Sequence, residues 1–337
     1  MKKNISILFK FIFFLSIGLF FIWLFLHNIS ADDKKKITNS ILEANYYWVI
    51  ISIFIGLLSH IIRTLRWQLL LEPLDYKSSF KNTFFAVMIG YFANLALPRL
   101  GEITRCGILK KYDNIPIANS LGTVITERAF DLVTFIILFF LNILIQFKLL
   151  NNYVNEKILL PISVKLRFIN NNYIFILSSF LLLVIIIIFL NKILKHNKFY
   201  IKIKDILQSF WQGLKSISQI KKPYLFILYT FLIWLAYFFT TYVCIFAIKE
   251  TTELNALAVF SILIFGTIGI MLVQGGIGIY PAIVAEILIL YNVNSVYGYA
   301  LGWLTWSAQT LTIIIFGILS LIMLSISNKK NTKYVKT

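Results

Sequence analysis

A few stretches of this sequence are mostly apolar but contain arginine, aspartate or glutamate. One is His60-Ile61-Ile62-Arg63-Thr64-Leu65-Arg66-Trp67. Helical spacing puts Arg63 and Trp67 on the same face as His60, with Arg66 three residues from Arg63. A cationic clamp of this kind suits a phosphate group. The alternative is that both arginines extend to a membrane interface, beside a tryptophan of the interfacial belt.

A second charged stretch is polar and broken by helix-interrupting residues, and it reads Asn94-Leu95-Ala96-Leu97-Pro98-Arg99-Leu100-Gly101-Glu102-Ile103-Thr104-Arg105. Pro98 and Gly101 interrupt the helix, which leaves free carbonyl groups at the end of one arm and free amide groups at the start of the next. Arg99 and Arg105 add cations beside those amides, so the stretch is suited to receive an anion. The structural alternative is that Glu102 only complements the helix dipole and pairs with Arg105.

A polar stripe follows on a helix made otherwise of Val, Ile, Leu and Phe, and its members are Ser120, Thr123, Glu127, Asp131 and Thr134. Their helical spacing makes one face, which must point into the protein. Glu127 and Asp131 repel each other unless a cation lies between them. We therefore expect a charge network in which Arg128, Glu102 and the arginines named above take part. Paired carboxylates can also serve acid–base catalysis or proton coupling. No nucleophile or metal-ligand set accompanies them, so we expect no metal site, no cofactor and no enzymatic reaction.

A glycine-rich stretch, Gln274-Gly275-Gly276-Ile277-Gly278-Ile279-Tyr280-Pro281, interrupts a second apolar region. We interpret Gln274, the three glycines and Pro281 as the break. Glycine admits backbone conformations that other residues resist, and proline fits the first turn of a returning helix. The stretch lacks the lysine of a phosphate-binding P-loop. We expect Glu286, on the returning arm, to line a cavity at this break. Gln309, on the last apolar run, either lines the same cavity or packs at the interface.

These stretches belong to a membrane protein, because 59% of the residues are hydrophobic and only 14% are charged, whereas about a quarter of a soluble domain is charged. Apolar runs long enough to cross a hydrocarbon core, which takes about 20 helical residues, predict six spans. They lie at 7–27, 46–70, 119–147, 172–190, 224–248 and 297–326. The net charge of +18 comes largely from lysines in loops beside apolar runs, so topology explains it better than nucleic-acid binding. The two cysteines, Cys106 and Cys244, form no redox or zinc spacing.

Two further apolar regions, 80–112 and 254–291, are interrupted near the middle, and we interpret each as a re-entrant helical hairpin. The first apolar run follows Met1-Lys2-Lys3 and ends without a convincing cleavage site, so we expect it to stay as the first helix. Lysine and arginine accumulate on the cytoplasmic side of short loops. Their distribution predicts that both termini are cytoplasmic.

The order of two spans, one hairpin and one span occurs twice, in halves of about 1–150 and 160–328 within a single domain over 1–337. The halves share a register, since Pro98 and Gly275 are 177 residues apart, as are Leu71 and Ile248. Inverted repeats whose broken helices meet near the midplane are an architecture of secondary transporters. Coincidence between similar hydropathy peaks is the alternative. The predicted fold class is all-α and polytopic, with about six transmembrane helices and two re-entrant hairpins arranged as inverted repeats.

Four ordered motifs carry a resemblance to a known family, and they are Arg63-x-x-Arg66-Trp67, Asn94-x-x-x-Pro98-Arg99-x-Gly101-Glu102-x-x-Arg105, Glu127-Arg128-x-x-Asp131 and Gly275-Gly276-x-Gly278. Over nearly the whole chain they resemble the transmembrane region of the lysylphosphatidylglycerol synthase family, also called the flippase-like domain family. The resemblance implies a membrane region that moves an aminoacylated lipid across the bilayer. Full-length members add a soluble aminoacyl-transferase domain. This chain ends shortly after its last apolar run, so we expect no lysine transfer. Relatives place an acidic residue soon after the second glycine motif, whereas here Tyr280-Pro281 follow and Glu286 lies farther along.

We therefore expect a flippase-like protein of the bacterial cytoplasmic membrane that binds and translocates an anionic or phosphate-bearing lipid, either a modified phospholipid or a polyprenyl-linked lipid. The residues expected at the headgroup are Arg63, Arg66, Asn94, Arg99 and Arg105. The alternative is a non-catalytic membrane subunit that presents a lipid to a separate transferase. A third hypothesis, an intramembrane enzyme that uses Glu127 and Asp131, ranks last. No ATP-binding motif is present, so active transport would draw on an ion gradient or a partner.

Overall fold

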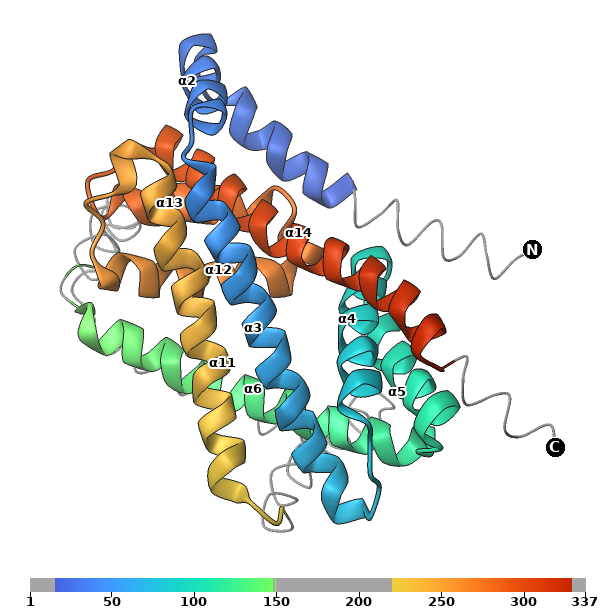
Figure 1. The fold of residues 1–337 in the computed structure, drawn as a ribbon. Helices are drawn as coiled ribbons and strands as arrows, with labels where there is room; N and C mark the ends of the chain where they lie inside the picture. The colour runs from blue at the N-terminus through green and yellow to red at the C-terminus, as the bar shows by residue number, and fades with distance from the viewer. Residues whose placement is uncertain (1–15, 148, 150–219, 329–337) are drawn as a thin grey trace, which may run out of the picture.

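The computed structural model describes residues 16–147, 149 and 220–328, and in these ranges the chain forms helices and no strand (Figure 1). The expected span at 172–190 and the first part of the span at 7–27 lie outside the described residues. The rest of that first span is a helix over Ser16–His27. The all-helical fold class predicted from the sequence is confirmed for the described residues.

Four helices are long and apolar enough to cross a membrane, and each corresponds to one of the six expected spans. With the 3-10 turns that extend two of them, they cover Tyr46–Leu74 (29 residues), Ile117–Ile145 (29 residues), Pro223–Ala247 (25 residues) and Ser295–Asn328 (34 residues). The elements are α3 (Tyr46–Leu71), η1 (Glu72–Leu74), α6 (Ile117–Ile145), α11 (Pro223–Cys244), η5 (Ile245–Ala247), η6 (Lys249–Thr251) and α14 (Ser295–Asn328). At about 1.5 Å per residue, each long helix exceeds the roughly 30 Å of a hydrocarbon core.

Local capping contacts fix where the first described elements begin. A short polar helix, α2 (Ala31–Leu42), precedes α3. The hydroxyl oxygen of Ser30 accepts a hydrogen bond from the amide of Asp33 at 3.1 Å and so caps α2. Asn45 caps α3 in the same way, because its side-chain oxygen accepts the amide of Tyr47 at 3.2 Å. The long span therefore begins at a polar residue rather than at an arbitrary point of an apolar run.

The first interrupted region is a helical hairpin. Its arms are α4 (Phe80–Ala96) and α5 (Leu100–Asp113). The arms approach closely at Gly90 and Gly101, where a Cβ atom on Gly101 would overlap the carbonyl group of Gly90. The side-chain oxygen of Asn94 accepts a hydrogen bond from the amide of Gly101 at 2.7 Å, which closes the turn. Arg99 lies in that turn in the left-handed conformation, with φ of 65°.

The second interrupted region is also a hairpin. Its parts are α12 (Ala256–Leu272), η7 (Gln274–Gly276) and α13 (Ile279–Ile289). Gly275, Gly276 and Gly278 have φ angles of 69°, 70° and 73°, a region that glycine adopts far more readily than other residues. Trp306 of α14 donates its indole N–H to the carbonyl oxygen of Gly275 at 2.6 Å. Gly278 packs so tightly against Gly18 of the first helix that no Cβ would fit. This turn is therefore held from two sides.

The arms of both hairpins are shorter than a membrane is thick. α4 and α12 have 17 residues each, α5 has 14 and α13 has 11. At 1.5 Å per residue these arms reach about 26, 21 and 17 Å, against roughly 30 Å for a hydrocarbon core. α4 also contacts η7, so the first hairpin touches the turn of the second.

Close helix pairs position these hairpins. α3 and α11 lie side by side, and α14 packs against α3, α4 and α13 (Figure 1). α14 approaches α13 through two glycines four residues apart. A Cβ on Gly298 would lie 2.9 Å from the backbone of Ala285, and one on Gly302 would lie 2.5 Å from that of Pro281. Small residues at this spacing let membrane helices pack backbone to backbone.

Candidate anion-binding site

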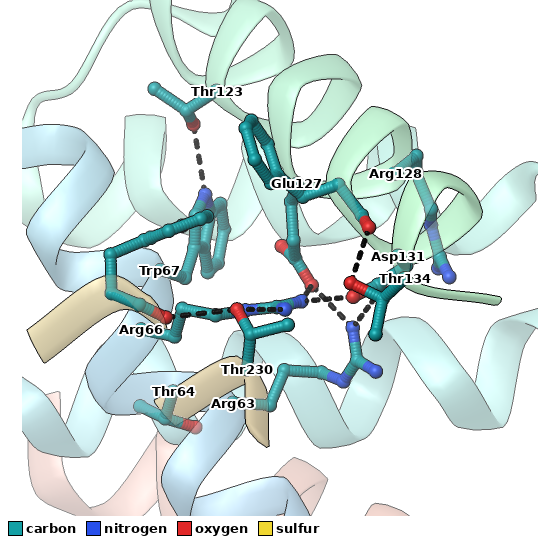
Figure 2. Close-up of polar contacts among 12 residues, drawn as sticks. Arg63, Thr64, Arg66, Trp67, Thr123, Glu127, Arg128, Asp131, Thr134 and Thr230 are labelled. Carbon is teal, nitrogen blue, oxygen red and sulfur yellow. Dashed lines mark hydrogen bonds and ion pairs between the residues drawn. The ribbon is translucent and has the colours of Figure 1, made fainter. Parts of the chain in front are cut away.

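α3 carries two arginines into the interior of the helical bundle. The side chains of Arg63 and Arg66 are 4% and 0% exposed, so neither extends to the surface. Trp67 is fully buried, and its indole N–H donates to the hydroxyl oxygen of Thr123 at 2.9 Å. This contact holds the charged turn of α3 against the polar stripe of α6 (Figure 2). The two arginines therefore do not extend to a membrane interface, which was the alternative interpretation.

Glu127 is the centre of the charge cluster. Its carboxylate is fully buried. Oε1 lies 2.6 Å from Nη1 of Arg63 and 3.4 Å from Nη2 of Arg66. Oε2 lies 3.0 Å from Nη2 of Arg105. Helices α3, α5 and α6 therefore meet at one acidic side chain.

Asp131 lies one turn farther along α6 and pairs with the same two arginines of α3. Its Oδ2 is 2.8 Å from Nη1 of Arg63, and its Oδ1 is 2.7 Å from Nη2 of Arg66. Figure 2 shows both guanidinium groups directed toward the two carboxylates. The Asp131 side chain is 17% exposed, so it forms the edge of the cluster, whereas Glu127 lies inside it. Shared cations remove the repulsion expected between carboxylates four residues apart.

The first hairpin contributes Arg105 to this cluster. Its guanidinium carbon lies 4.5 Å from the centroid of the Trp67 ring, and the residue is 3% exposed. A cation over a buried indole adds roughly 2 kcal/mol of attraction when desolvated. Arg99, six residues earlier, has a different environment, because it is exposed in the hairpin turn and pairs with no carboxylate among the described residues. The two cations of this stretch are therefore not equivalent.

The interior of the cluster holds more positive than negative charge. Arg63, Arg66 and Arg105 face two carboxylates, which leaves an excess of one positive charge when all five groups are ionised. A separate pair, Arg128 and Glu102 at 3.2 Å, is neutral and more exposed, at 43% and 21%. The Nε atoms of the three interior arginines are buried and have no hydrogen-bond partner among the described residues. Both charge and N–H donors are thus left over for an anion.

α11 supplies polar partners that the sequence reasoning missed. The hydroxyl of Tyr237 accepts a hydrogen bond from Nη2 of Arg63 at 2.8 Å. The hydroxyl of Thr230 accepts one from Nη1 of Arg66 at 3.1 Å. The sequence does contain a signal for them, because the polar or amphipathic residues of this uncharged helix recur at helical spacing. These are Thr230, Trp234, Tyr237 and Thr241.

A cavity of about 370 Å³ lies beside the cluster. Arg63, Arg128 and Asp131 line one part of it. The rest of its wall comes from α3, α4, α11, α12, α14 and Tyr280, the residue before Pro281 at the start of α13. The cavity therefore joins the charge cluster to the second hairpin. Gln309 of α14 is one of its lining residues.

The comparisons with known proteins agree with the motifs. The sequence model described as the lysylphosphatidylglycerol synthase TM region matches residues 7–317. The chain belongs to this family. The resemblance carried by the four motifs is thereby confirmed, and the matched region contains the whole charge cluster. A relative from Methanocaldococcus jannaschii, UPF0104 membrane protein MJ1078, is 29% identical over 248 residues, which cover 72% of this chain and 100% of the relative. No solved structure matches the chain. Family and helices together make it a multi-pass membrane protein, consistent with a lipid-related role.

The remaining predicted residues form none of the ion pairs of the cluster, although Asn94 lines a small pocket together with Glu102, Arg105 and Arg128. Asn94 closes the first hairpin turn, and Pro98 is exposed in that turn. The backbone of Gln274 belongs to η7, and Pro281 is buried in the first turn of α13. Glu286 lines a separate, largely apolar cavity of about 750 Å³ between the first helix, α12 and α13. Among the described residues, no three His, Cys, Asp or Glu side chains are grouped so as to hold a metal ion.

Proposed function

We propose that this protein binds the anionic headgroup of a membrane lipid at the charge cluster and translocates that lipid across the bacterial cytoplasmic membrane. One observation carries the proposal, namely the excess positive charge of three buried arginines, one of which, Arg63, lines a cavity. An arginine at the centre of a bilayer costs roughly 2.5 to 3.5 kcal/mol on insertion scales. Packing alone gives little reason to keep a third guanidinium without its own carboxylate. A phosphate would supply the missing charge and accept the unused N–H donors.

The size of the cavity suits a headgroup rather than a whole lipid. Ligand pockets typically hold about 300 to 1,000 Å³, and 370 Å³ lies near the lower limit. A second, apolar groove of about 510 Å³ lies between α6, α11 and α12. Trp234 and Leu263 line both the cavity and this groove, so the two are adjacent. The headgroup would occupy the cavity while acyl or prenyl chains lie in the apolar groove.

Movement across the membrane would depend on the two hairpins. We infer that the first is re-entrant from the cytoplasm and the second from outside, with both termini cytoplasmic, so that the halves are inverted repeats. In support, the order of a long helix, two short hairpin arms and a long helix occurs as α3 to α6 and again as α11 to α14. Arg99, exposed at the tip of the first hairpin, would contact the headgroup as it crosses, and buried Arg63 would hold it in the cavity.

A non-enzymatic role fits the cluster better than catalysis. Glu127 is engaged by three arginines and Asp131 by two, which leaves neither carboxylate free for acid–base work. The second candidate function is a non-catalytic subunit that presents the lipid to a separate transferase. The family description favours this candidate to the extent that it names the membrane part of a synthase.

Transport by the purified chain tests the proposal. The protein would be reconstituted in vesicles that carry fluorescent phosphatidylglycerol in both leaflets, and external dithionite would bleach the outer leaflet. Wild-type protein should expose inner-leaflet lipid to bleaching, and Arg63→Gln should abolish that exposure. Lys110→Gln removes one exposed charge from the last turn of α5 and should transport normally. Equal transport by Arg63→Gln would refute the site, whereas wild-type binding without transport would favour the presenting subunit.

Arg99→Ala tests the contact at the hairpin tip without disturbing the interior. Because Arg99 is exposed, this variant should insert and unfold like the wild type while losing lipid movement. Thermal unfolding and the bleaching assay on the same preparation measure both properties. Transport at the wild-type rate would exclude a role for the first hairpin turn in headgroup capture.

A further inference from the structure

A second polar group, far from the charge cluster, joins the C-terminal end of α6 to the second hairpin. We call it the Ser261 network, and its members are Asn142, Gln146, Ser261 of α12 and Tyr291, which follows α13. Nε2 of Gln146 donates to Oγ of Ser261 at 2.8 Å, and Nδ2 of Asn142 donates to the same oxygen at 3.2 Å. The network therefore connects the α3–α6 half of the chain to the α11–α14 half.

Three of these side chains form a closed ring of hydrogen bonds. The hydroxyl of Tyr291 donates to Oε1 of Gln146 and lies 3.0 Å from the hydroxyl of Ser261. Because a hydroxyl has a single hydrogen, Ser261 then donates to Tyr291. Gln146 completes the ring through its bond to Ser261, and it also contacts the carbonyl oxygen of Leu257 at 3.2 Å. Asn142, Gln146 and Ser261 are 0%, 5% and 1% exposed, so the ring is shielded from the surroundings.

The Ser261 network is a point of attachment for a part of α6 that is otherwise exposed. The structure describes α6 throughout, and beyond Ala129 the one buried residue of this helix is Asn142. Leu144, half a turn farther, is 74% exposed. A contact between the rings of Phe139 and Phe265, with centroids 6.1 Å apart, adds a link to α12. The charge cluster holds α6 at Glu127, about 22 Å away at 1.5 Å per residue.

The Ser261 network also lies at one end of the apolar groove between α6, α11 and α12. Leu138 and Phe260 line this groove. Asn142 is one helical turn beyond Leu138, and Ser261 is next to Phe260. Leu263 lines both the groove and the central cavity. While the network is intact, α6 and α12 stay together where the groove ends.

We propose that the Ser261 network is a latch that closes the outer end of the lipid pathway. When it opens, the C-terminal half of α6 separates from α12, while the charge cluster holds the other half in place. Interhelical hydrogen bonds in membrane proteins are weak, each worth about threefold in an equilibrium constant, so a few of them can open reversibly. The inference rests on the proposed function, which assigns this pathway to a lipid and this end of α6 to the outside. It goes further by naming the contact that must break for release.

Thiol labelling measures the opening. A cysteine at Leu263 in the full-length chain would be exposed to an impermeant maleimide outside right-side-out membrane vesicles. Gln146→Leu removes the hydrogen bonds of the glutamine side chain and should speed this labelling about tenfold. Tyr291→Phe removes one hydroxyl at nearly constant shape and should speed it about threefold. Labelling of the buried native cysteines, Cys106 and Cys244, is measured without the added cysteine and subtracted.

Gln68→Leu is the matched control. Gln68 donates its amide N–H to the carbonyl oxygen of Ser78 at 2.9 Å, a similar contact that stays within one half of the chain. This variant should label at the wild-type rate. A second measurement uses spin labels at Leu144 and Ala256, both exposed, to follow the distance between α6 and α12. That distance should lengthen in Gln146→Leu and not in Gln68→Leu.

Several results would overturn the latch. Unchanged labelling or an unchanged spin-label distance in Gln146→Leu would refute it, as would equal acceleration by Gln68→Leu. Faster labelling only with reagent inside the vesicles would refute its outer position. Neither measurement uses a lipid, so both are independent of the bleaching assay. Lipid movement by a protein whose network does not respond would refute the latch alone, whereas a responsive network without lipid movement would refute the proposed function alone.

Discussion

Replacement of Glu127 by glutamine should destabilise the protein more than any other single carboxylate-to-amide change in the cluster. The carboxylate contacts three guanidinium groups at 2.6, 3.4 and 3.0 Å and is fully buried. Removing one member of a buried ion pair costs roughly 3 to 5 kcal/mol, because the remaining charge is left uncompensated. Glutamine keeps the volume and one carbonyl oxygen, so we expect a cost of about 3 kcal/mol, at the lower end.

Asp131→Asn is the natural comparison for this variant. Asp131 pairs with two arginines instead of three, and its side chain is 17% exposed. Its amide variant should therefore lose less stability, roughly 1 to 3 kcal/mol. Stability would be followed by loss of helical circular dichroism as sodium dodecyl sulfate is added to protein in mild detergent micelles.

A double-mutant cycle separates the charge effect from simple loss of packing. Arg105→Met keeps an unbranched side chain over Trp67 but removes the third positive charge. In the double variant with Glu127→Gln, two arginines and one carboxylate remain charged. The cluster then has the same excess of one positive charge as in the wild type. The double variant should be more stable than the sum of the single losses predicts, by roughly 1 to 3 kcal/mol. Stability of Glu127→Gln within about 0.5 kcal/mol of the wild type would refute the reasoning, because changes of that size are typical of surface sites.

Two further predictions concern the hairpins and the topology. Gly101→Ala should destabilise the first hairpin by about 1 to 3 kcal/mol, because the added Cβ would overlap Gly90. The control is Gly107→Ala on the same helix, whose Cβ would meet nothing within 4 Å. In the same detergent titration this control should be neutral or slightly stabilising. A single cysteine at exposed Lys111 should react with impermeant thiol reagents only from the cytoplasmic side, and one at exposed Glu250 only from outside. Labelling of either site from the opposite side would contradict the inverted-repeat arrangement.

Local sequence signals predict the spans closely, because hydropathy and caps act over short distances. The expected spans at 46–70 and 224–248 correspond to helical stretches over Tyr46–Leu74 and Pro223–Ala247. The partners of each charge depend instead on how helices pack. Arg99 and Arg105 belong to one motif, yet one is exposed and the other buried. The reason is that Arg99 lies in the hairpin turn, whereas Arg105 lies one and a half turns into α5, where it faces α3 and α6.

The contribution of α11 is hidden for a related reason. Its sequence carries no charge, so a search for charged motifs does not draw attention to it. α11 packs beside α3, and only this contact brings Tyr237 and Thr230 to the arginines. The same helix places Trp234 and two threonines on the cavity wall. An uncharged helix thus takes part in the ion-pair cluster as well as in the wall of the cavity.

This double role would connect the proposed headgroup binding to the packing of the two halves of the chain. Tyr237 accepts a hydrogen bond from Arg63 and also lines the cavity, so it touches both the cluster and the space that a headgroup would fill. Arg63 belongs to the α3–α6 half, and Tyr237 belongs to the α11–α14 half. An anion that binds Arg63 would compete for the guanidinium N–H groups that now reach Tyr237, Glu127 and Asp131. Headgroup binding would therefore loosen a contact between the halves, which is the change that an alternating arrangement of two repeats requires.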